Sequence, residues 1–436
     1  MQVAPHFGPL EKADAGLSSL ARGVVGSEIL KIGAEVRALK AKGIQVCNLT
    51  VGDFDPAQFP VPPELSEGTR QALLDGQTNY PPSDGLMPLR EAIVRFYARE
   101  LSLDYPVESV LVASGARPLL YAAYRTLLDP GDVALYSVPS WNNNHYVWLS
   151  GARAVEIPVH EATNFFPTPA QLASHLHVAR ALVVNSPLNP TGTVIAAAAL
   201  AEIAALVVEE NRRRDAAGRR PLFLVFDQVY WMLTFHGAAH VTPVGLVPGV
   251  APYTILLDAI SKSFCATGLR VGWALMPPAL RGRMADLLGH VGAWAPRAEQ
   301  AATAKLLDAP ERYRPWQAAL KEGLKARLDA LADGLLSMKR DGLPVDAIPP
   351  QGAIYLSARF DLAGATWRGR RLETNDEIRK LLLEEAGFAA VPFQAFGLRE
   401  ETGWFRLSVG SAAPAEITAV LPRLRATLAD AVLPAR

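Results

Sequence analysis

The stretch YTILLDAISKSFCATGLRVGWALMP (253–277) holds two short apolar runs, YTILLDA (253–259) and VGWALMP (271–277), joined by a polar turn. Nearly continuous apolar runs of this length are typical of strands buried on both faces. Five similar runs precede them: SVLVAS (109–114), DVALYSVP (132–139), RAVEIPV (153–159), ALVVNSP (181–187) and PLFLVFDQVY (221–230). Helical stretches separate the runs, so the sequence predicts an α/β fold with a mainly parallel sheet of seven strands.

The sequence on either side of this region has a different rhythm. After Pro296 a long helical pattern leads to two strand-like runs, AIYLSARF (353–360) and WFRLSVG (404–410), and to a closing helix near 414–429. These elements predict a second, smaller α+β domain. We expect an N-terminal arm (1–30), a small domain (31–48 plus 315–436) and a large domain (49–314).

The composition excludes several classes of partner. Lys plus Arg and Asp plus Glu both number 43, so no polyanionic partner such as nucleic acid is expected. The longest apolar stretch, 193–208, is too short for a membrane span. The N-terminus shows no signal-peptide pattern, and two distant cysteines, Cys47 and Cys265, fit a reducing compartment. We therefore expect a cytoplasmic protein that binds no membrane, and no metal-site motif occurs.

Lys262 and Arg270 form the first candidate site. Lys262 follows the apolar run 253–259 in a Ser-rich turn, and Arg270 comes eight residues later. Partial desolvation at a strand end lowers the pKa of a lysine and makes its amine nucleophilic. The arginine could bind a phosphate. A surface lysine and arginine beside a turn would give the same short pattern.

Asp227 ends another apolar strand, where an ionised carboxylate needs a partner. The protonated ring nitrogen of pyridoxal 5'-phosphate (PLP) is such a partner, because an ionised aspartate there lets the ring absorb carbanion charge. Tyr230, three residues further on, could reach the hydroxyl group of the same ring. A helix cap or a metal ligand is the alternative for Asp227.

Three more motifs follow candidate strands. The prolines of NSPLNPTG (185–192) favour an extended chain that places the Asn189 amide at the mouth of the sheet. SGAR (114–117) ends a strand and opens a helix, whose free N–H groups could bind phosphate. Trp141 could stack on an aromatic cofactor. A turn, a capped helix and a core tryptophan are the alternatives.

Arg406 interrupts the apolar run 404–410, so its guanidinium should need a buried anion. A substrate carboxylate, bound by two parallel hydrogen bonds, would meet that need. An internal salt bridge is the alternative.

The order and spacing of these motifs resemble those of the class I/II aminotransferases, the aspartate-aminotransferase-like branch of the fold-type I PLP-dependent enzymes. The resemblance covers residues 28 to 430. It implies that the seven-stranded sheet belongs to a large PLP-binding domain and that the smaller α+β domain accompanies it.

The resemblance also implies roles for the individual residues. The residues implied to bind the cofactor are Lys262 as its Schiff-base partner, Asp227 at the pyridine nitrogen, Tyr230 and Asn189 at the ring hydroxyl, Trp141 on the ring face, and Gly115, Ala116, Arg117, Ser261 and Arg270 around the phosphate. The residues implied to bind the substrate carboxylate are Gly52, Asn189 and Arg406. Lys262, Asp227 and Tyr230 would act in catalysis.

Tyr80 looks like the family's tyrosine that reaches the cofactor phosphate of the neighbouring subunit, which implies a homodimer with shared active sites. Many relatives also have a phosphate-binding serine three residues before the lysine, where this chain has Ala259. Ser261 or Tyr80 would then replace that contact.

The implied reaction moves the amino group of an L-amino acid to a 2-oxo acid by a ping-pong mechanism, with Lys262 also acting as the base. β-Elimination by a C–S lyase, oxidation and decarboxylation use the same residues and stay open as alternatives. A non-catalytic ligand sensor would need a DNA-binding domain, for which the arm is too short. The sequence does not identify the substrate side chain: Arg297 could bind a second carboxylate, whereas Phe54, Trp294 and Tyr355 could line an apolar pocket.

Overall fold

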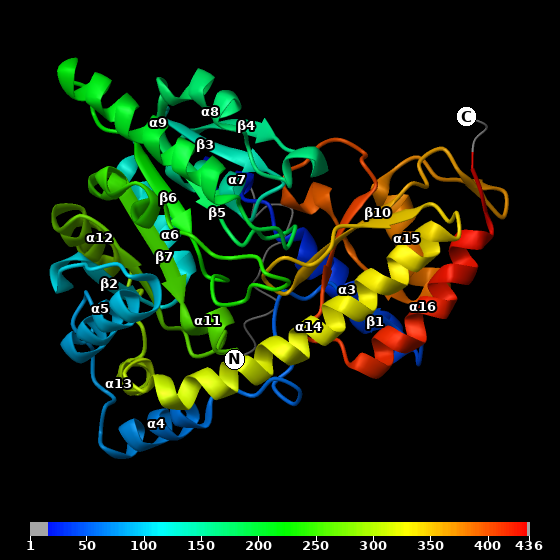
Figure 1. Ribbon diagram of the computed structural model, residues 1–436, viewed down its shortest axis with the longest axis horizontal. Helices are drawn as coiled ribbons and strands as arrows, with labels where there is room; N and C mark the ends of the chain where they lie inside the picture. The colour runs from blue at the N-terminus through cyan, green and yellow to red at the C-terminus, as the bar shows by residue number, and fades with distance from the viewer. Residues whose placement is uncertain (1–15, 434–436) are drawn as a thin grey trace.

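The computed structural model describes residues 16–433 and consists of two packed parts (Figure 1). The larger part is built around a sheet with helices on both faces, and the smaller part packs helices on short strands. The long helix α14 (Pro310–Arg340) runs from the larger part across to the smaller one. The first half of the predicted arm lies outside the described residues. The rest includes α2 (Ser19–Gly23) and leads into α3 (Glu28–Ala41).

The large sheet contains the seven predicted strands. They are β2 (Val110–Ala113), β3 (Val133–Val138), β4 (Arg153–Pro158), β5 (Ala179–Asn185), β6 (Phe223–Asp227), β7 (Thr254–Ala259) and β8 (Gly272–Leu275). Their order is β2-β8-β7-β6-β5-β3-β4. Strand β8 is antiparallel to both of its neighbours, and the remaining pairs are parallel. The prediction of a mainly parallel seven-stranded sheet is confirmed.

Helices cover both faces of this sheet, which accounts for the apolar runs. The helices around it are α5 (Met87–Leu101), α6 (Ala116–Leu127), α7 (Asn143–Ser150), α8 (Pro169–Leu176), α9 (Ala197–Ala216), α12 (Pro278–His290) and α13 (Arg297–Leu307). On β6, Leu224 and Phe226 pack with residues of α5 and α9, whereas Val225 packs with residues of α6 and α12. Successive residues of a strand face opposite ways, so a strand covered on both sides needs apolar residues at every position.

The smaller part has its own apolar core around an antiparallel sheet. Its strands, in the order β14-β15-β10-β9, are β14 (Val391–Pro392), β15 (Trp404–Ser408), β10 (Tyr355–Phe360) and β9 (Val345–Ala347). Helices α14, α15 (Asn375–Ala386) and α16 (Pro414–Ala429) share this core. The two strands and the closing helix that the sequence predicts here are therefore present.

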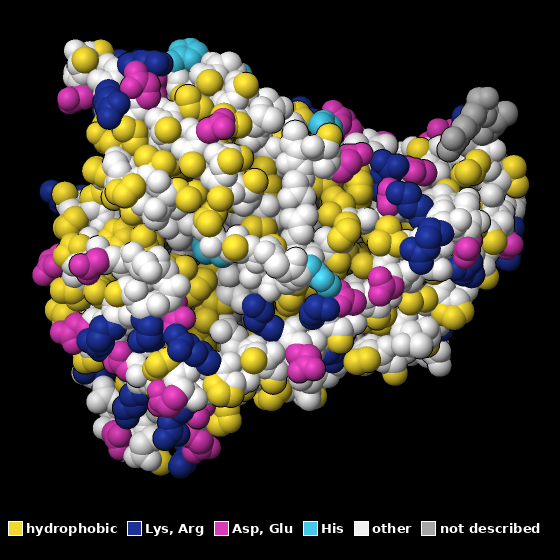
Figure 2. All heavy atoms as spheres, viewed as in Figure 1, with side chains coloured by type: hydrophobic (Ala, Val, Ile, Leu, Met, Phe, Trp, Pro, Cys, Tyr) yellow, Lys and Arg dark blue, Asp and Glu magenta, His cyan; other side chains and the backbone are white. Residues whose placement is uncertain are grey.

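Short elements complete the chain. They are β1 (Cys47–Asn48), which pairs with β13 (Phe388–Ala389), then α4 (Pro63–Leu74), α10 (Pro243–Leu246), α11 (Ile260–Ser263), β11 (Thr366–Trp367), β12 (Arg370–Arg371) and β16 (Ala431–Val432). No helix within residues 16–433 has the length and apolarity needed to cross a membrane. Charged side chains of both signs are scattered over the face shown in Figure 2, in keeping with the net charge of zero.

The carboxyl ends of the parallel strands meet at one edge of the sheet. Asn185 ends β5, Asp227 ends β6 and Ala259 ends β7, and Asn185 lies directly opposite Asp227 in the strand register. Open α/β sheets bind their ligands outside this edge.

Candidate active site

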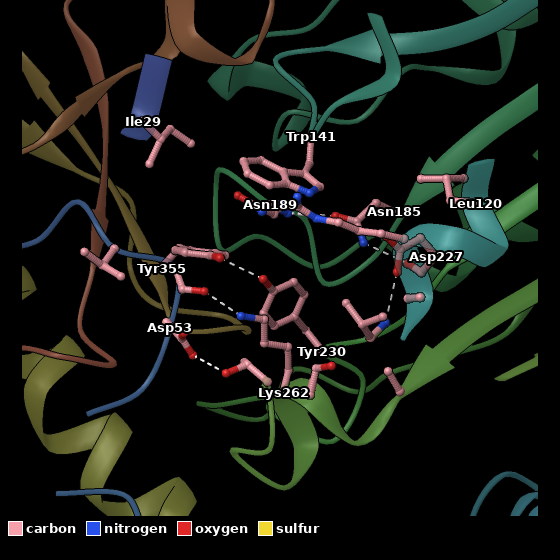
Figure 3. Close-up of a pocket in the computed structure, with 18 of the residues that line it drawn as sticks. Ile29, Asp53, Leu120, Trp141, Asn185, Asn189, Asp227, Tyr230, Lys262 and Tyr355 are labelled. Atoms are coloured by element: carbon pink, nitrogen blue, oxygen red, sulfur yellow. Dashed lines mark hydrogen bonds between the residues drawn. The ribbon is translucent and has the colours of Figure 1, made fainter. Parts of the chain in front are cut away.

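A cavity of about 530 Å³ lies at the carboxyl edge of the large sheet, between the two parts of the molecule. Figure 3 shows Asp227 reaching it from the end of β6, Lys262 from the turn after β7, and Tyr355 from β10. The predicted site residues that line the cavity are Gly52, Ala116, Arg117, Trp141, Asn189, Asp227, Tyr230, Ser261, Lys262, Arg270 and Arg406. Segments from positions 52 to 406 thus converge on one space.

Lys262 lies on α11, the single helical turn that follows β7. Its Nζ donates a hydrogen bond to the Gly52 carbonyl at 2.5 Å and lies 5.8 Å from the centre of the Phe54 ring. Burial lowers the pKa of Lys262 to about 8, against the opposing effect of the Asp53 carboxylate. At pH 7 such an amine is still mostly protonated, but its neutral fraction is far larger than at the ordinary lysine pKa of about 10.4.

Asp227 presents a buried carboxylate to the same cavity. Its Oδ1 accepts a hydrogen bond from the Val229 N–H at 3.2 Å, and its backbone carbonyl accepts one from Asn185 Nδ2 at 2.8 Å. Burial raises the pKa of Asp227 to about 6. Within residues 16–433 no cation forms an ion pair with this carboxylate, so a cationic ligand group would stabilise its ionised form.

An anion site lies where β2 runs into α6. Gly115 precedes the helix with φ 93°, and a side chain at this position would collide with the Arg270 guanidinium. Arg270 donates hydrogen bonds to the carbonyls of Ser114 at 3.0 Å and Thr267 at 2.5 Å. Arg117 adds a second guanidinium, which lies 5.0 Å from the centre of the Trp141 ring. The helix N-terminus and two cations form a cradle suited to a phosphate.

Arg406, on β15, is only 1% exposed, yet it forms no salt bridge with any described residue. It donates hydrogen bonds to Asn189 Oδ1 at 3.1 Å and to the Thr50 carbonyl at 2.6 Å, and its Nε is buried without a partner. A side chain on Gly52 would approach the Tyr355 hydroxyl to 2.6 Å. The internal salt bridge considered for Arg406 is therefore absent, and the guanidinium keeps hydrogen-bonding capacity for a carboxylate.

Aromatic side chains line another part of the cavity. Trp141 follows β3 and contacts the Phe396 ring at 6.2 Å between ring centres. The Tyr230 and Tyr355 hydroxyls share a hydrogen bond of 2.7 Å (Figure 3). Tyr355, which the sequence offers only as a possible pocket residue, is thus joined directly to a predicted site residue.

Two residues that the sequence offered as binding residues, Tyr80 and Arg297, do not line the cavity of this chain. Tyr80 is 80% exposed and packs against Trp294 at 5.1 Å between ring centres. Arg297 donates hydrogen bonds to Gln77 Oε1 at 2.7 Å and to the Tyr80 carbonyl at 3.3 Å. Neither side chain lines the cavity.

Several lining residues were missed by the sequence reasoning: Ile29, Leu30, Asp53, Leu120, Tyr146, Asn185 and Thr267. Asp53 directly follows the predicted Gly52, and Asn185 is the first residue of NSPLNPTG (185–192), so their positions in the sequence were a usable signal. Ile29 lies on α3, far away in sequence, and no local pattern connects it with the sheet edge.

Comparison with known proteins agrees with this geometry. Residues 44–424 match the family model described as aminotransferase class I and II. The aspartate aminotransferase of Geobacillus stearothermophilus is 32% identical over 90% of this chain and 94% of its own. That of Rhizobium meliloti (strain 1021) is 31% identical over 92% and 93%.

Solved structures give the same result. The aspartate aminotransferase from Rhizobium meliloti superposes with a TM-score of 0.86 at 28% identity, covering 95% of this chain and 99% of that one. The N-succinyldiaminopimelate aminotransferase from Mycobacterium tuberculosis gives a TM-score of 0.81 at 28% identity, covering 94% and 100%. These relatives do not favour β-elimination, oxidation or decarboxylation. The chain belongs to the class I and II aminotransferases, PLP-dependent enzymes that transfer amino groups between amino acids and 2-oxo acids.

Proposed function

We propose that Lys262 is the attachment point of PLP and the proton-transfer base, and that Asp227 faces the ring nitrogen. The observation that carries this proposal is the convergence of a lysine amine and an unpaired carboxylate from adjacent strands on one cavity. When bound, PLP supplies an aldehyde that reacts with amines and an electron-withdrawing ring.

The residues of the cavity fit PLP at each of its functional groups. The cradle of Gly115, Arg117 and Arg270 has the charge and close backbone approach that a phosphate needs. Ala116 and Ser261 line the same space and would complete the phosphate site, with no side-chain hydroxyl at Ala259. The Asp227 carboxylate, which has no cationic partner in the described chain, would hold the ring nitrogen protonated.

The remaining residues would orient the ring and the substrate. Tyr230 and Asn189 would donate hydrogen bonds to the ring hydroxyl, with the Tyr230 hydroxyl held in place by Tyr355. Trp141 would cover one face of the ring. Arg406 lines the cavity and would bind the substrate carboxylate, beside the Gly52 backbone, through the N–H groups of Nη1 and Nη2 that remain after their bonds to Asn189 and the Thr50 carbonyl.

Lys262 would then move the proton of the reaction. Once the substrate amine has taken its place, Nζ is free to remove the proton from the substrate α-carbon. The pKa of about 8 favours this role, because an amine with a lower pKa is more often neutral and able to accept a proton. The nearby Gly52 carbonyl holds Nζ on the substrate side of the cavity.

Replacing Lys262 tests this assignment. We expect Lys262→Ala to abolish the covalent absorption band of bound PLP and to lower kcat by at least about 10²–10⁴-fold, the range for losing a general base. Lys321→Ala is a matched control, because Lys321 is also half-buried with a lowered pKa but lies on α14 away from the cavity. A Lys262→Ala enzyme with control-level turnover would refute the role of Lys262.

We also propose a homodimer in which Tyr80 contributes to the cofactor phosphate site of its neighbour. The side chain is 80% exposed on this chain and does not line its cavity, which supports a role in another subunit.

Mixing two impaired variants tests the shared site. A dimer of one Lys262→Ala subunit and one Tyr80→Ala subunit has one intact site, because the first supplies Tyr80 to the second. We expect activity in a mixture refolded together to exceed the sum of the separate variants, with dimers seen by sedimentation. Activity equal to that sum would place Tyr80 in its own subunit's site or in none.

We propose aspartate as the amino donor, because both sequence relatives quoted above and the Rhizobium meliloti structure are aspartate aminotransferases.

Comparing L-aspartate with L-asparagine tests this choice, because the two substrates have nearly the same shape and differ in the charge of the side chain. We expect kcat/KM for aspartate to be higher by at least about tenfold, since a desolvated site that pairs with a charge discriminates against its neutral isostere. A panel of other L-amino acids completes the measurement. A neutral or aromatic amino acid with the highest kcat/KM would contradict the choice of aspartate and leave amino-group transfer intact.

A further inference from the structure

A buried polar network lies directly behind the strand ends that carry Asp227 and Lys262. Its members are Tyr97 on α5, Gln228 and Trp231 after β6, Asp258 on β7, and Trp273 on β8. Each is at most 8% exposed, and none lines the cavity. A network of this kind inside an apolar core is costly unless every group is satisfied.

The Tyr97 hydroxyl is the centre of this network, and its orientation is determined by its neighbours. It accepts hydrogen bonds from Gln228 Nε2 at 3.1 Å and from Trp273 Nε1 at 3.2 Å. Both acceptor positions are therefore used, so the hydroxyl proton points to Asp258 Oδ2, 3.1 Å away. His240 lies 3.3 Å from Gln228 Oε1, which orients the Gln228 amide with its nitrogen toward Tyr97.

The Asp258 carboxylate only accepts hydrogen bonds. Its Oδ1 accepts from the Ala259 N–H at 2.7 Å, and its Oδ2 accepts from Trp231 Nε1 at 2.8 Å and from the Tyr97 hydroxyl. Three accepted hydrogen bonds and no donated one stabilise the ionised form of this carboxylate. Burial raises the pKa of Asp258 to about 7, the three donors oppose this, and Asp227 raises it further. No cation pairs with Asp258 anywhere in residues 16–433.

The network is attached to the active site through the backbone. Asp258 precedes Lys262 by four residues, Gln228 follows Asp227 directly, and Trp231 is four residues beyond it. The Trp231–Asp258 hydrogen bond joins the loop after β6 to β7, and the Gln228 N–H donates to the Leu257 carbonyl at 3.0 Å. A displacement of Asp258 would therefore move the two strand ends that hold Asp227 and Lys262.

We propose that Asp258 and Tyr97 are positioning residues for the PLP site, which hold the ends of β6 and β7 in register and place a second buried negative charge behind Asp227. This inference rests on the proposed roles of Lys262 and Asp227. The added charge favours the protonated ring nitrogen, and the hydrogen bonds keep Asp227 and Lys262 at a constant separation.

Tyr97→Phe and Asp258→Asn test the inference. Each variant is compared with the wild-type holoenzyme for PLP dissociation constant, absorption band of bound PLP, kcat, KM and melting temperature. We expect PLP affinity and kcat to fall by about tenfold, as for other partners that support a bound group indirectly, with a shifted absorption band and little change in KM. Asp258→Asn should have the larger effect, because it places an N–H group opposite existing donors.

Tyr313→Phe is the matched control. Tyr313 is also fully buried, and its hydroxyl likewise donates to a carboxylate, Glu100 Oε1, at 2.6 Å, but it lies on α14 and no network member contacts it by a hydrogen bond. We expect this variant to lose stability while keeping PLP affinity, absorption band and kcat.

If Tyr97→Phe lowers only the melting temperature, as the control does, the network supports the fold alone and the inference is overturned. Should Asp258→Asn not fold, Tyr97→Phe decides the question. Failure of the proposed function would be seen separately, as an absorption band of bound PLP that persists in Lys262→Ala protein.

Discussion

The structure of the site depends on one constraint: two ionisable groups, one at the end of β6 and one on the turn after β7, are held together in a largely desolvated cavity. Burial moves the pKa of Asp227 up to about 6 and that of Lys262 down to about 8, so in each case it disfavours the charged form. Such an arrangement is expensive in a protein interior unless a ligand compensates it. In the proposed site, a cofactor with a cationic ring nitrogen and an aldehyde would supply a partner for each of these two groups.

The two parts of the molecule contribute different binding groups to this edge of the sheet. The large sheet supplies rigid strand ends and a helix N-terminus, which suit an anchored cofactor with a phosphate. The smaller part contributes Arg406 and Tyr355 from an antiparallel sheet. Asn189 joins the two, since it follows β5 and accepts a hydrogen bond from Arg406. The substrate would therefore bind where the two parts meet.

Much of this could be predicted from local sequence. The alternation of apolar runs and helical stretches indicated all seven strands, because a sheet covered on both faces leaves a strong signal at every strand position. Lys262, Asp227, Asn189 and Trp141 could be placed because each directly follows such a run. What the local pattern could not supply was the tertiary neighbourhood. Ile29 reaches the cavity from a distant helix, Tyr97 joins Asp258 across 161 positions, and Tyr80 does not line the cavity of its own chain.

The covalent link between PLP and the Lys262 amine is the proposed feature on which the other residue roles depend. The most direct measurement is reduction of the PLP-loaded protein with borohydride, followed by proteolysis and mass spectrometry of the labelled peptides. We expect a single phosphopyridoxyl modification, on Lys262. A label on another lysine, or a protein that takes up PLP without any reducible link, would contradict it.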